Sequence, residues 1–218
     1  MIKVERSFPA PKSLAIEEAK KDGKYNLADV TEQLRKDFHN KCYICEIKPV
    51  ADPEVEHRLP HKYNTISGGK FSWENLFWVC RHCNNVKNKE KYEDGILDCC
   101  RTDPEDCIRI ELTGDTVVIR AIQEDPSTFL TVQLLDEVYN TRNTGIRIAA
   151  CDARIQLMQN EMGKLYKALV AFGKNPESRK TNRELRVLLD RESAFAAVKR
   201  DYIRKYLKTY PQLEIYLR

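Results

Sequence analysis

Apolar positions in the first 70 residues predict two helices and one short strand. A helix is expected over about residues 14–21, and a second is expected to begin at a cap on Asn26 and to end near His39. The apolar stripe of the second helix consists of Leu27, Val30, Leu34 and Phe38. Residues 55–59 have a β-like composition, and Ser67-Gly68-Gly69 predicts a flexible turn.

The middle of the chain predicts a helix followed by a β-hairpin. An apolar and aromatic segment over residues 73–79 leads into a polar stretch over residues 80–91, for which we expect a helix. Two β-rich runs within residues 108–122 flank Gly114-Asp115, a dipeptide typical of hairpin turns. Asp125-Pro126-Ser127 then interrupts the pattern.

After residue 127 the apolar residues recur with helical spacing, which predicts a helical core with a break at residues 173–176. The four stripes are Leu130, Leu134, Leu135 and Val138; Ile148, Ile155, Met158, Met162, Leu165 and Leu169; Leu185, Val187, Leu188 and Leu189; and Phe195, Val198, Tyr202, Tyr206 and Leu207. We therefore expect an α+β fold with two domains, residues 1–126 and a helical region over residues 127–218.

Charge is distributed unevenly along the 218 residues, whose net charge is +4. Residues 127–218 carry 17 Lys and Arg against 10 Asp and Glu, or +7, and residues 1–126 carry 20 against 23, or −3. The basic part suits a polyanion or an acidic partner surface, although an ordinary solvated helix surface has the same composition. Apolar runs fall short of the roughly 20 residues of a membrane span, and the N-terminal segment lacks an apolar signal core, so we expect a cytoplasmic location.

Four of the eight cysteines form two C-x-x-C pairs, Cys42 with Cys45 and Cys80 with Cys83. In a reducing compartment, such pairs more often bind a metal than form disulfides, and two of them supply the four ligands of a tetrahedral Zn²⁺. The 34 residues between the pairs imply a substantial structure inserted there. A redox pair, four unrelated buried cysteines, and His82 as a substitute ligand are the alternatives. The remaining cysteines are expected to be buried apolar residues: Cys99, Cys100, Cys107 and Cys151.

A second pattern lies around the cysteine pairs, with Glu56-His57 in VEHRLP, Asn75 in WENLFW and Asn84 in CRHCNNVKNK. In these residues the chain resembles the HNH endonuclease family, in which a β-hairpin and a helix surround one metal ion. The family order is an acid and a histidine, a central asparagine, a final histidine or asparagine, and often a lysine three positions later, here Lys87. The resemblance implies a ββα-metal nuclease core within residues 1–126. This chain has Glu where the family more often has Asp, and Asn in place of the final His.

Hydrolysis of a phosphodiester requires an activated water and a cation for the developing charge. His57 is the expected general base, because a neutral imidazole accepts a proton near pH 7. Glu56 and Asn84 are the expected oxygen ligands of Mg²⁺ or Mn²⁺. Neighbouring residues on a strand point to opposite faces, so Glu56 and His57 require a bend or a twist there.

Three further residues complete the expected site. Asn75 is expected to hold the loop that carries His57 through side-chain hydrogen bonds. Lys87 follows Asn84 by one turn and is a candidate contact for a DNA phosphate. His61 is a second candidate for the base and for a DNA contact, ranked below His57 because it does not follow an acid.

Residues 1–125 also resemble the HNH nuclease subunit of Septu-type bacterial antiphage systems and related retron-associated nucleases. The similar segments are IKVERS, KCYICE, EHRLPH, WENL, CNNVK and ILDCCRTDPEDCIRI. This resemblance implies an ATPase partner, which the C-terminal helices would contact. A non-catalytic zinc-stabilised DNA-binding module and a scaffold with a decayed nuclease core are the alternatives. The complete set of Glu56, His57, Asn75 and Asn84 favours a nuclease.

Overall fold

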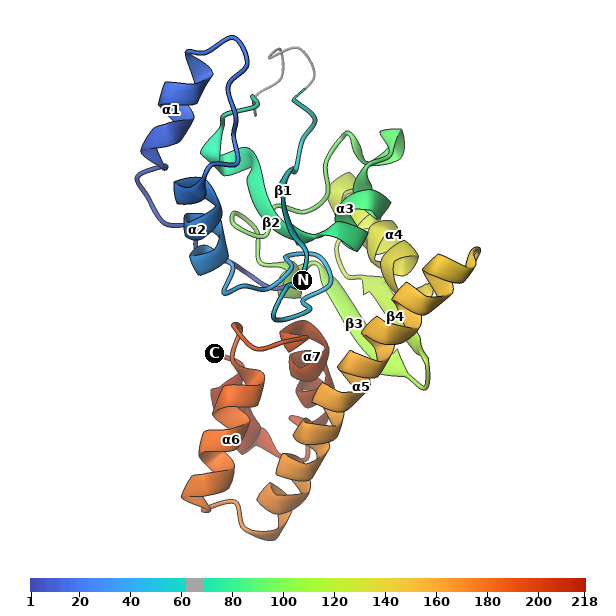
Figure 1. Cartoon of the computed structure of the whole chain (residues 1–218). Helices are drawn as coiled ribbons and strands as arrows, with labels where there is room; N and C mark the ends of the chain where they lie inside the picture. Colours follow the sequence, from blue (N-terminus) through green and yellow to red (C-terminus); the bar gives the residue numbers. More distant parts are fainter. Residues whose placement is uncertain (62–68) are drawn as a thin grey trace.

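The computed structural model of the chain describes residues 1–61 and 69–218, so Ser67 and Gly68 of the predicted turn lie outside the described residues. In the described part, two short N-terminal helices, two β-hairpins and a bundle of longer C-terminal helices follow one another (Figure 1). The helices are α1 (Lys12–Glu18), α2 (Ala28–Asp37), α3 (Arg81–Lys87), α4 (Pro126–Asn140), α5 (Gly145–Lys174), α6 (Arg179–Leu189) and α7 (Ala196–Tyr206). The strands are β1 (Pro53–His57), β2 (Leu76–Cys80), β3 (Ile108–Thr113) and β4 (Thr116–Ala121), and 3₁₀ helices cover Trp73–Asn75, Glu90–Tyr92, Pro104–Asp106 and Pro211–Tyr216.

The first hairpin and the helix after it form a ββα unit. β1 pairs with β2 in antiparallel register, with Glu56 opposite Phe77 and His57 opposite Leu76. Every residue of β2 is buried, and α3 begins at Arg81 directly after the strand. A bend or a twist was expected at Glu56 and His57, and the ladder pairs regularly through His57 without interruption. The unit confirms the predicted α+β core.

The second helix differs from its predicted form at both ends. Leu27, and not Asn26, occupies the N-cap position of α2, where no side chain makes a capping hydrogen bond. The helix ends at Asp37, because His39 and Asn40 adopt left-handed backbone angles with φ of 54° and 53°. Left-handed residues cannot continue a right-handed helix, so the chain turns here toward the first cysteine pair.

The other boundaries follow from local chemistry. The helix expected over residues 80–91 stops at Lys87, and the strand expected over residues 55–59 lies two residues earlier. The hairpin of β3 and β4 is confirmed, with Gly114 at a positive φ of 63° in its turn. The side chain of Asp125 caps α4 by accepting a hydrogen bond from the Thr128 backbone N–H at 3.0 Å.

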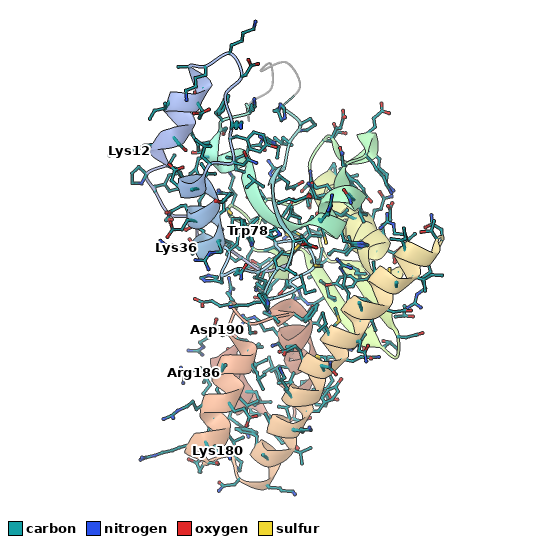
Figure 2. All side chains as sticks on the ribbon, in the orientation of Figure 1. Lys12, Lys36, Trp78, Lys180, Arg186 and Asp190 are labelled. Carbon is teal, nitrogen blue, oxygen red and sulfur yellow. The ribbon has the colours of Figure 1, made fainter. Side chains whose placement is uncertain are left out.

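The C-terminal helices pack against both hairpins. α4 lies on β4 and α3, and α7 lies on β3, so the hydrophobic core continues from the N-terminal segment into the bundle. Trp78 of β2 is inside this core, whereas Lys180 and Arg186 extend outward from α6 (Figure 2). Val187 was expected to lie in the core, but it is 65% exposed. The division into two domains at residue 126 stays a prediction.

Among residues 1–61 and 69–218, no helix is long and apolar enough to cross a lipid bilayer.

Candidate active site and cysteine cluster

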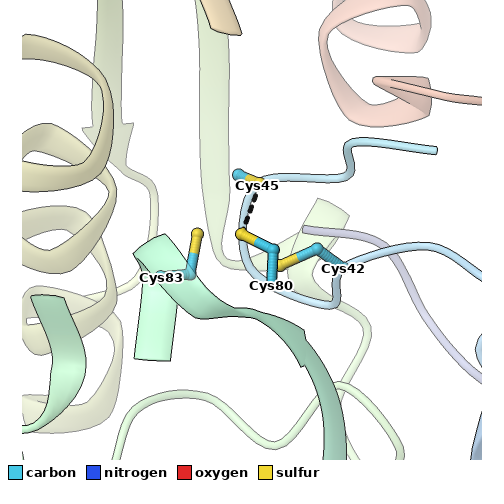
Figure 3. A group of neighbouring side chains, drawn as sticks. All are labelled: Cys42, Cys45, Cys80 and Cys83. Carbon is cyan, nitrogen blue, oxygen red and sulfur yellow. Dashed lines mark hydrogen bonds between the residues drawn. The ribbon is translucent and has the colours of Figure 1, made fainter. Parts of the chain in front are cut away.

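The four cysteines of the two C-x-x-C pairs come together as predicted (Figure 3). All four are buried, and their Sγ atoms lie within 4.8 Å of one another. The Sγ atoms of Cys45 and Cys80 are 3.8 Å apart. A tetrahedral zinc ion with Zn–S bonds of about 2.3 Å places its sulfur ligands about 3.8 Å from each other. The cluster therefore has the size and the donor set of a Zn(Cys)₄ site.

Two side chains of the C-terminal helices contact this cluster. Arg154 of α5 is buried, and its Nη2 lies 3.5 Å from the Sγ of Cys80. Hydrogen bonds with the neighbouring thiols lower the pKa of Cys80, and the Arg154 guanidinium lowers it further. Tyr139 of α4 donates a hydrogen bond to the backbone carbonyl of Cys45 at 2.6 Å. Four thiolates around a divalent ion would carry a net negative charge, which the Arg154 guanidinium would offset.

His82 does not belong to the cluster. Its Nε2 lies 3.3 Å from the backbone carbonyl oxygen of Val138, and burial lowers the pKa of this histidine to about 4. The four-cysteine set is therefore favoured over a set that includes His82.

A separate cavity of about 400 Å³ lies beside the ββα unit. It gathers most of the predicted catalytic residues, which come from β1, from the segment after β1 and from α3. The predicted residues that line it are Glu56, His57, His61, Asn84 and Lys87. Glu56 and Lys87, which are 31 positions apart in the sequence and belong to different elements, thus line one polar pocket.

His57 is held by a backbone hydrogen bond. Its Nε2 lies 2.9 Å from the carbonyl oxygen of Lys70, which can only accept, so Nε2 carries the proton and Nδ1 has the lone pair. The ring packs against Tyr25 and His61, with centroids 4.4 Å and 4.3 Å away. Burial lowers the pKa of His57 to about 4, so the ring is neutral at pH 7. The geometry presents a neutral imidazole with a defined tautomer.

Glu56 is buried and has two partners on different elements. The hydroxyl of Tyr43 donates to Oε1, and Nζ of Lys87 lies 3.3 Å from Oε2. Burial raises the pKa of Glu56, and the Lys87 ammonium opposes this shift. Lys87 also donates to the backbone carbonyl of His57 at 3.2 Å. The ammonium is thus an internal countercharge, and its contact with a DNA phosphate stays a prediction.

Asn84 faces the cavity from α3 with a fixed amide. Its Nδ2 donates to Oε2 of Glu54 at 2.6 Å. With the amide nitrogen engaged in this way, the carbonyl oxygen of the side chain is the atom that can bind a ligand. Glu54 in turn lies 3.7 Å from Nε of Arg81. Glu54 belongs to no motif in the sequence, although it lies two residues before Glu56 and hence on the same face of β1.

Asn75 is not among the residues that line the cavity, and it makes the side-chain hydrogen bonds expected of it. Its Oδ1 accepts from the Leu59 backbone N–H at 2.8 Å, and its Nδ2 donates to the Leu59 carbonyl at 2.9 Å. Its own carbonyl accepts from the Arg58 backbone N–H at 3.0 Å. Asn75 thereby fixes the segment that directly follows His57.

Several residues of the site carried no sequence signal. Tyr43, which contacts Glu56, was hidden inside the first cysteine pair, and Tyr25 lies in the loop before α2. The Lys70 contact uses a backbone carbonyl, which any residue type supplies. Their contacts with the site form only when the loops fold against β1, so the sequence alone does not indicate them.

The ββα unit thus carries a polar cavity and a cluster of four cysteines. Residues 42–90, less than half of the chain, match the family model described as HNH endonuclease. The matched segment begins at the first cysteine and includes β1, β2 and α3. Comparisons with curated proteins and with solved structures gave no match for the chain.

Proposed function

We propose that this protein is a metal-dependent endonuclease that hydrolyses DNA phosphodiester bonds with His57 as its general base. The observation that carries the proposal is the 2.9 Å contact between His57 Nε2 and the Lys70 carbonyl oxygen. It leaves Nδ1 with the free lone pair, and His57 lines the cavity together with Glu56 and Asn84. A base of this kind is suited to activate a water molecule.

In the proposed reaction, Nδ1 of His57 takes a proton from a water molecule while the water oxygen attacks phosphorus. A new P–O bond forms, and the bond from phosphorus to the 3′ oxygen breaks. The products are a 5′ phosphate and a 3′ hydroxyl, whose proton comes from solvent. Asn75 acts at a distance, because its hydrogen bonds to Leu59 hold the segment next to His57.

Glu56 and Asn84 would hold the catalytic cation, because carboxylate and amide oxygens are the ligands that Mg²⁺ and Mn²⁺ prefer. When bound, the cation supplies positive charge for the phosphate and for the leaving 3′ oxygen. Lys87 stabilises the ionised form of Glu56 in its buried position. We further propose that Lys87 and His61 contact DNA phosphates near the scissile bond.

The cysteine cluster would hold a structural Zn²⁺. Its four identical ligands leave no coordination position for water or substrate, which is typical of structural sites. Arg154 would offset the charge of the four thiolates from α5.

We also propose that the protein is the nuclease effector of a cytoplasmic antiphage complex with an ATPase subunit. The resemblance of residues 1–125 to Septu-type and retron-associated nucleases supports this role. Apolar side chains on the first half of α5 would suit a protein partner, since Ile146 is 86% exposed and Ile148 and Leu157 are also exposed.

The experiment that tests the nuclease proposal is cleavage of supercoiled plasmid with Mg²⁺ or Mn²⁺. We expect His57→Ala to lower the rate by about 10²- to 10⁴-fold with an unchanged melting temperature. Glu184→Ala is the control, because Glu184 is exposed on α6 and lies outside the cavity. Wild type and His57→Ala cutting equally would contradict the assignment.

The same assay is repeated with the ATPase subunit and with a matched RNA substrate. Cleavage that requires the subunit supports the effector role, and preference for RNA would correct the substrate class. DNA binding without cleavage under every condition would support the alternative of a non-catalytic zinc-stabilised DNA-binding or scaffold subunit.

A further inference from the structure

Cys99 and Cys100 are adjacent cysteines that belong neither to the cysteine cluster nor to the lining of the candidate active site. They lie in a turn between the 3₁₀ helices Glu90–Tyr92 and Pro104–Asp106. Both were expected to be buried. Cys99 is 0% exposed, but Cys100 is partly exposed, and among the eight cysteines, which all lie in the described part of the chain, it alone is not buried. One thiol of the pair therefore reaches solvent and the other does not.

A fixed cation lies beside the exposed thiol. Nη2 of Arg6 donates to the Sγ of Cys100 at 3.6 Å. The same guanidinium donates to the carbonyl oxygens of Trp73 and Leu76, each at 2.9 Å. It also lies over the ring of Trp73, 4.9 Å from the centroid. These contacts fix the positive charge of Arg6 next to the sulfur.

The other charged groups around the pair add to this positive charge. Nζ of Lys3 donates to the backbone carbonyl oxygens of Cys100 and Arg101, each at 2.9 Å. Asp98 is the acid of this segment, and the Nε atoms of Arg58 and Arg101 both lie 3.6 Å from its Oδ2. The surroundings of Cys100 are thus positive on balance, which stabilises a thiolate.

The two thiols differ in acidity. Contact with the Cys99 thiol lowers the pKa of Cys100, and the Arg6 guanidinium lowers it further against the effect of burial. The same contact between the thiols, together with burial, raises the pKa of Cys99 well above its usual range. The thiolate and not the thiol is the nucleophile, so Cys100 is the member of the pair that attacks, and Cys99 keeps its proton.

The other six cysteines lack this combination of exposure and a neighbouring cation. Four of them point at one another in the buried cluster. The Sγ of Cys107 donates to the Asp103 carbonyl at 3.7 Å, and both Cys107 and Cys151 are buried. The Sγ of Cys151 donates to the Thr141 carbonyl at 3.3 Å. Buried thiols are shielded from a reagent in solution, so an oxidant should reach Cys100 first.

We propose that Cys99 and Cys100 form a thiol pair that is oxidised by hydroperoxides, with Cys100 as the nucleophile and Cys99 as the resolving thiol. The Cys100 thiolate attacks the outer oxygen of the hydroperoxide, an S–O bond forms and the O–O bond breaks. The sulfur is oxidised to a sulfenic acid, and the leaving oxygen takes a proton from solvent and departs as water or an alcohol. The Cys99 thiol then attacks the sulfenic sulfur. An S–S bond forms, and the hydroxyl group leaves as water with the proton of Cys99.

The disulfide of this pair should be easy to reduce. The Cα atoms of adjacent residues are about 3.8 Å apart across a trans peptide, closer than the roughly 4.4–6.8 Å that most disulfides span. A strained disulfide is more easily reduced, so small thiols should return the pair to its dithiol form. The pair is therefore suited to a reversible modification and not to a permanent crosslink.

The test treats the full chain, purified with zinc and without free reductant, with equimolar H₂O₂ and maps the products by mass spectrometry. Cleavage by trypsin after Lys91 and Arg101 gives a peptide of residues 92–101, which contains Cys99 and Cys100 and no other cysteine. We expect this peptide to lose two hydrogen atoms before any other cysteine peptide changes. Dithiothreitol should then restore its original mass.

Two variants separate the roles of the cysteines. In Cys99→Ser, the sulfenic acid of Cys100 has no resolving partner, so dimedone should trap it at Cys100. In Cys100→Ser, Cys99 should stay reduced, because it is buried and protonated. Cys107→Ser is the matched control and should form the disulfide like wild type, since Cys107 lies outside the pair and the cluster.

Arg6→Gln addresses the cation. The fraction of thiolate should fall while the nucleophilicity of the remaining thiolate rises, so we expect oxidation to slow by about 3- to 10-fold. Arg35→Gln, at an exposed position of α2, is the matched control. An unchanged rate in a folded Arg6→Gln protein would overturn the role of the guanidinium. If this variant does not fold, because Arg6 also packs on Trp73, the cysteine variants decide.

Four results overturn the thiol pair. They are a peptide of residues 92–101 that stays reduced while cluster cysteines are oxidised, oxidation of Cys99 at the wild-type rate in Cys100→Ser, no trapped sulfenic acid in Cys99→Ser, and a disulfide that joins Cys100 of two chains. These readouts do not involve cleavage of DNA, so the thiol pair and the proposed nuclease activity fail or stand separately.

Discussion

The cysteine cluster and the candidate active site lie in the same ββα unit but are built in opposite ways. In the cluster, four identical side chains are buried and point at one another within 4.8 Å. The candidate active site is a cavity of about 400 Å³ lined by side chains of different types. Neighbouring residues fix these side chains through hydrogen bonds and an ion pair. A cluster whose side chains all point at one another leaves no position for a substrate and serves to stabilise the fold. A cavity whose side chains are fixed by hydrogen bonds to neighbouring residues keeps other atoms free to bind a ligand.

α3 connects the two regions. Cys83 and Asn84 are consecutive residues of this helix, one in the cluster and the other in the cavity. Loss of the cluster should therefore damage both regions, whereas loss of a cavity residue should leave the cluster intact. This asymmetry orders the expected effects of the substitutions below.

The largest effect is expected for Cys80→Ser. A structural zinc site contributes directly to folding, so loss of one ligand should abolish stoichiometric zinc and lower the melting temperature of the whole chain. Cys107→Ser is the matched control, since Cys107 lies outside the cluster and its bond to the Asp103 carbonyl suits a hydroxyl. Metal analysis and thermal unfolding measure both. A zinc-free Cys80→Ser protein with the wild-type melting temperature would contradict the structural role.

Asn84→Ala should affect only the cavity. Removing a proposed ligand of the catalytic cation should lower cleavage by about 10²-fold or more, comparable to removing one group that stabilises transition-state charge. Zinc should stay near one ion per chain, because the side chain of Asn84 points to Glu54 and not to the thiols. Plasmid cleavage and zinc analysis on the same preparation provide the check. If zinc is lost as well, Asn84 belongs to the structural region.

Asn75→Ala should have an intermediate effect that combines stability and activity. The substitution removes the partner of the Leu59 N–H and carbonyl, and an unpaired buried polar group costs about 1–3 kcal/mol. Urea unfolding measures this cost, and cleavage should fall because the segment after His57 is released. Asn26→Ala, at an exposed position, serves as the control. A stable Asn75→Ala protein with full activity would remove Asn75 from the positioning role.

The smallest effect is expected for Glu54→Gln, which retains the shape of the side chain but removes its charge. The amide of Asn84 would lose a charged acceptor, so the Mg²⁺ concentration for half-maximal cleavage should rise about 10-fold, the usual scale for a group behind a metal ligand. Glu184→Gln on the exposed face of α6 is the matched control. An unchanged Mg²⁺ requirement would show that Glu54 does not orient Asn84.

Local patterns in the sequence predicted the parts of the fold that neighbours along the chain decide. The period of the apolar residues predicted the C-terminal helices, and Gly114-Asp115 predicted the turn between β3 and β4. The two C-x-x-C pairs predicted the cysteine cluster, because the spacing alone brings both thiolates of a pair toward one point. The boundaries of α2 and α3 were less accurate, since they depend on capping and on backbone angles that composition does not fix.

Only the tertiary structure decided how these residues meet. The Lys87 ammonium pairs with Glu56 because α3 packs beside β1, although its place one turn after Asn84 had suggested a DNA phosphate as its partner. Arg154 reaches Cys80 across 74 positions of sequence, and Tyr166 reaches Tyr202 across two helices. The sequence specifies the residue types and their order, but the long-range contacts depend on how whole helices and strands pack together. The amino-acid pattern therefore determined which groups are present, and the fold determined which atoms of them face a ligand.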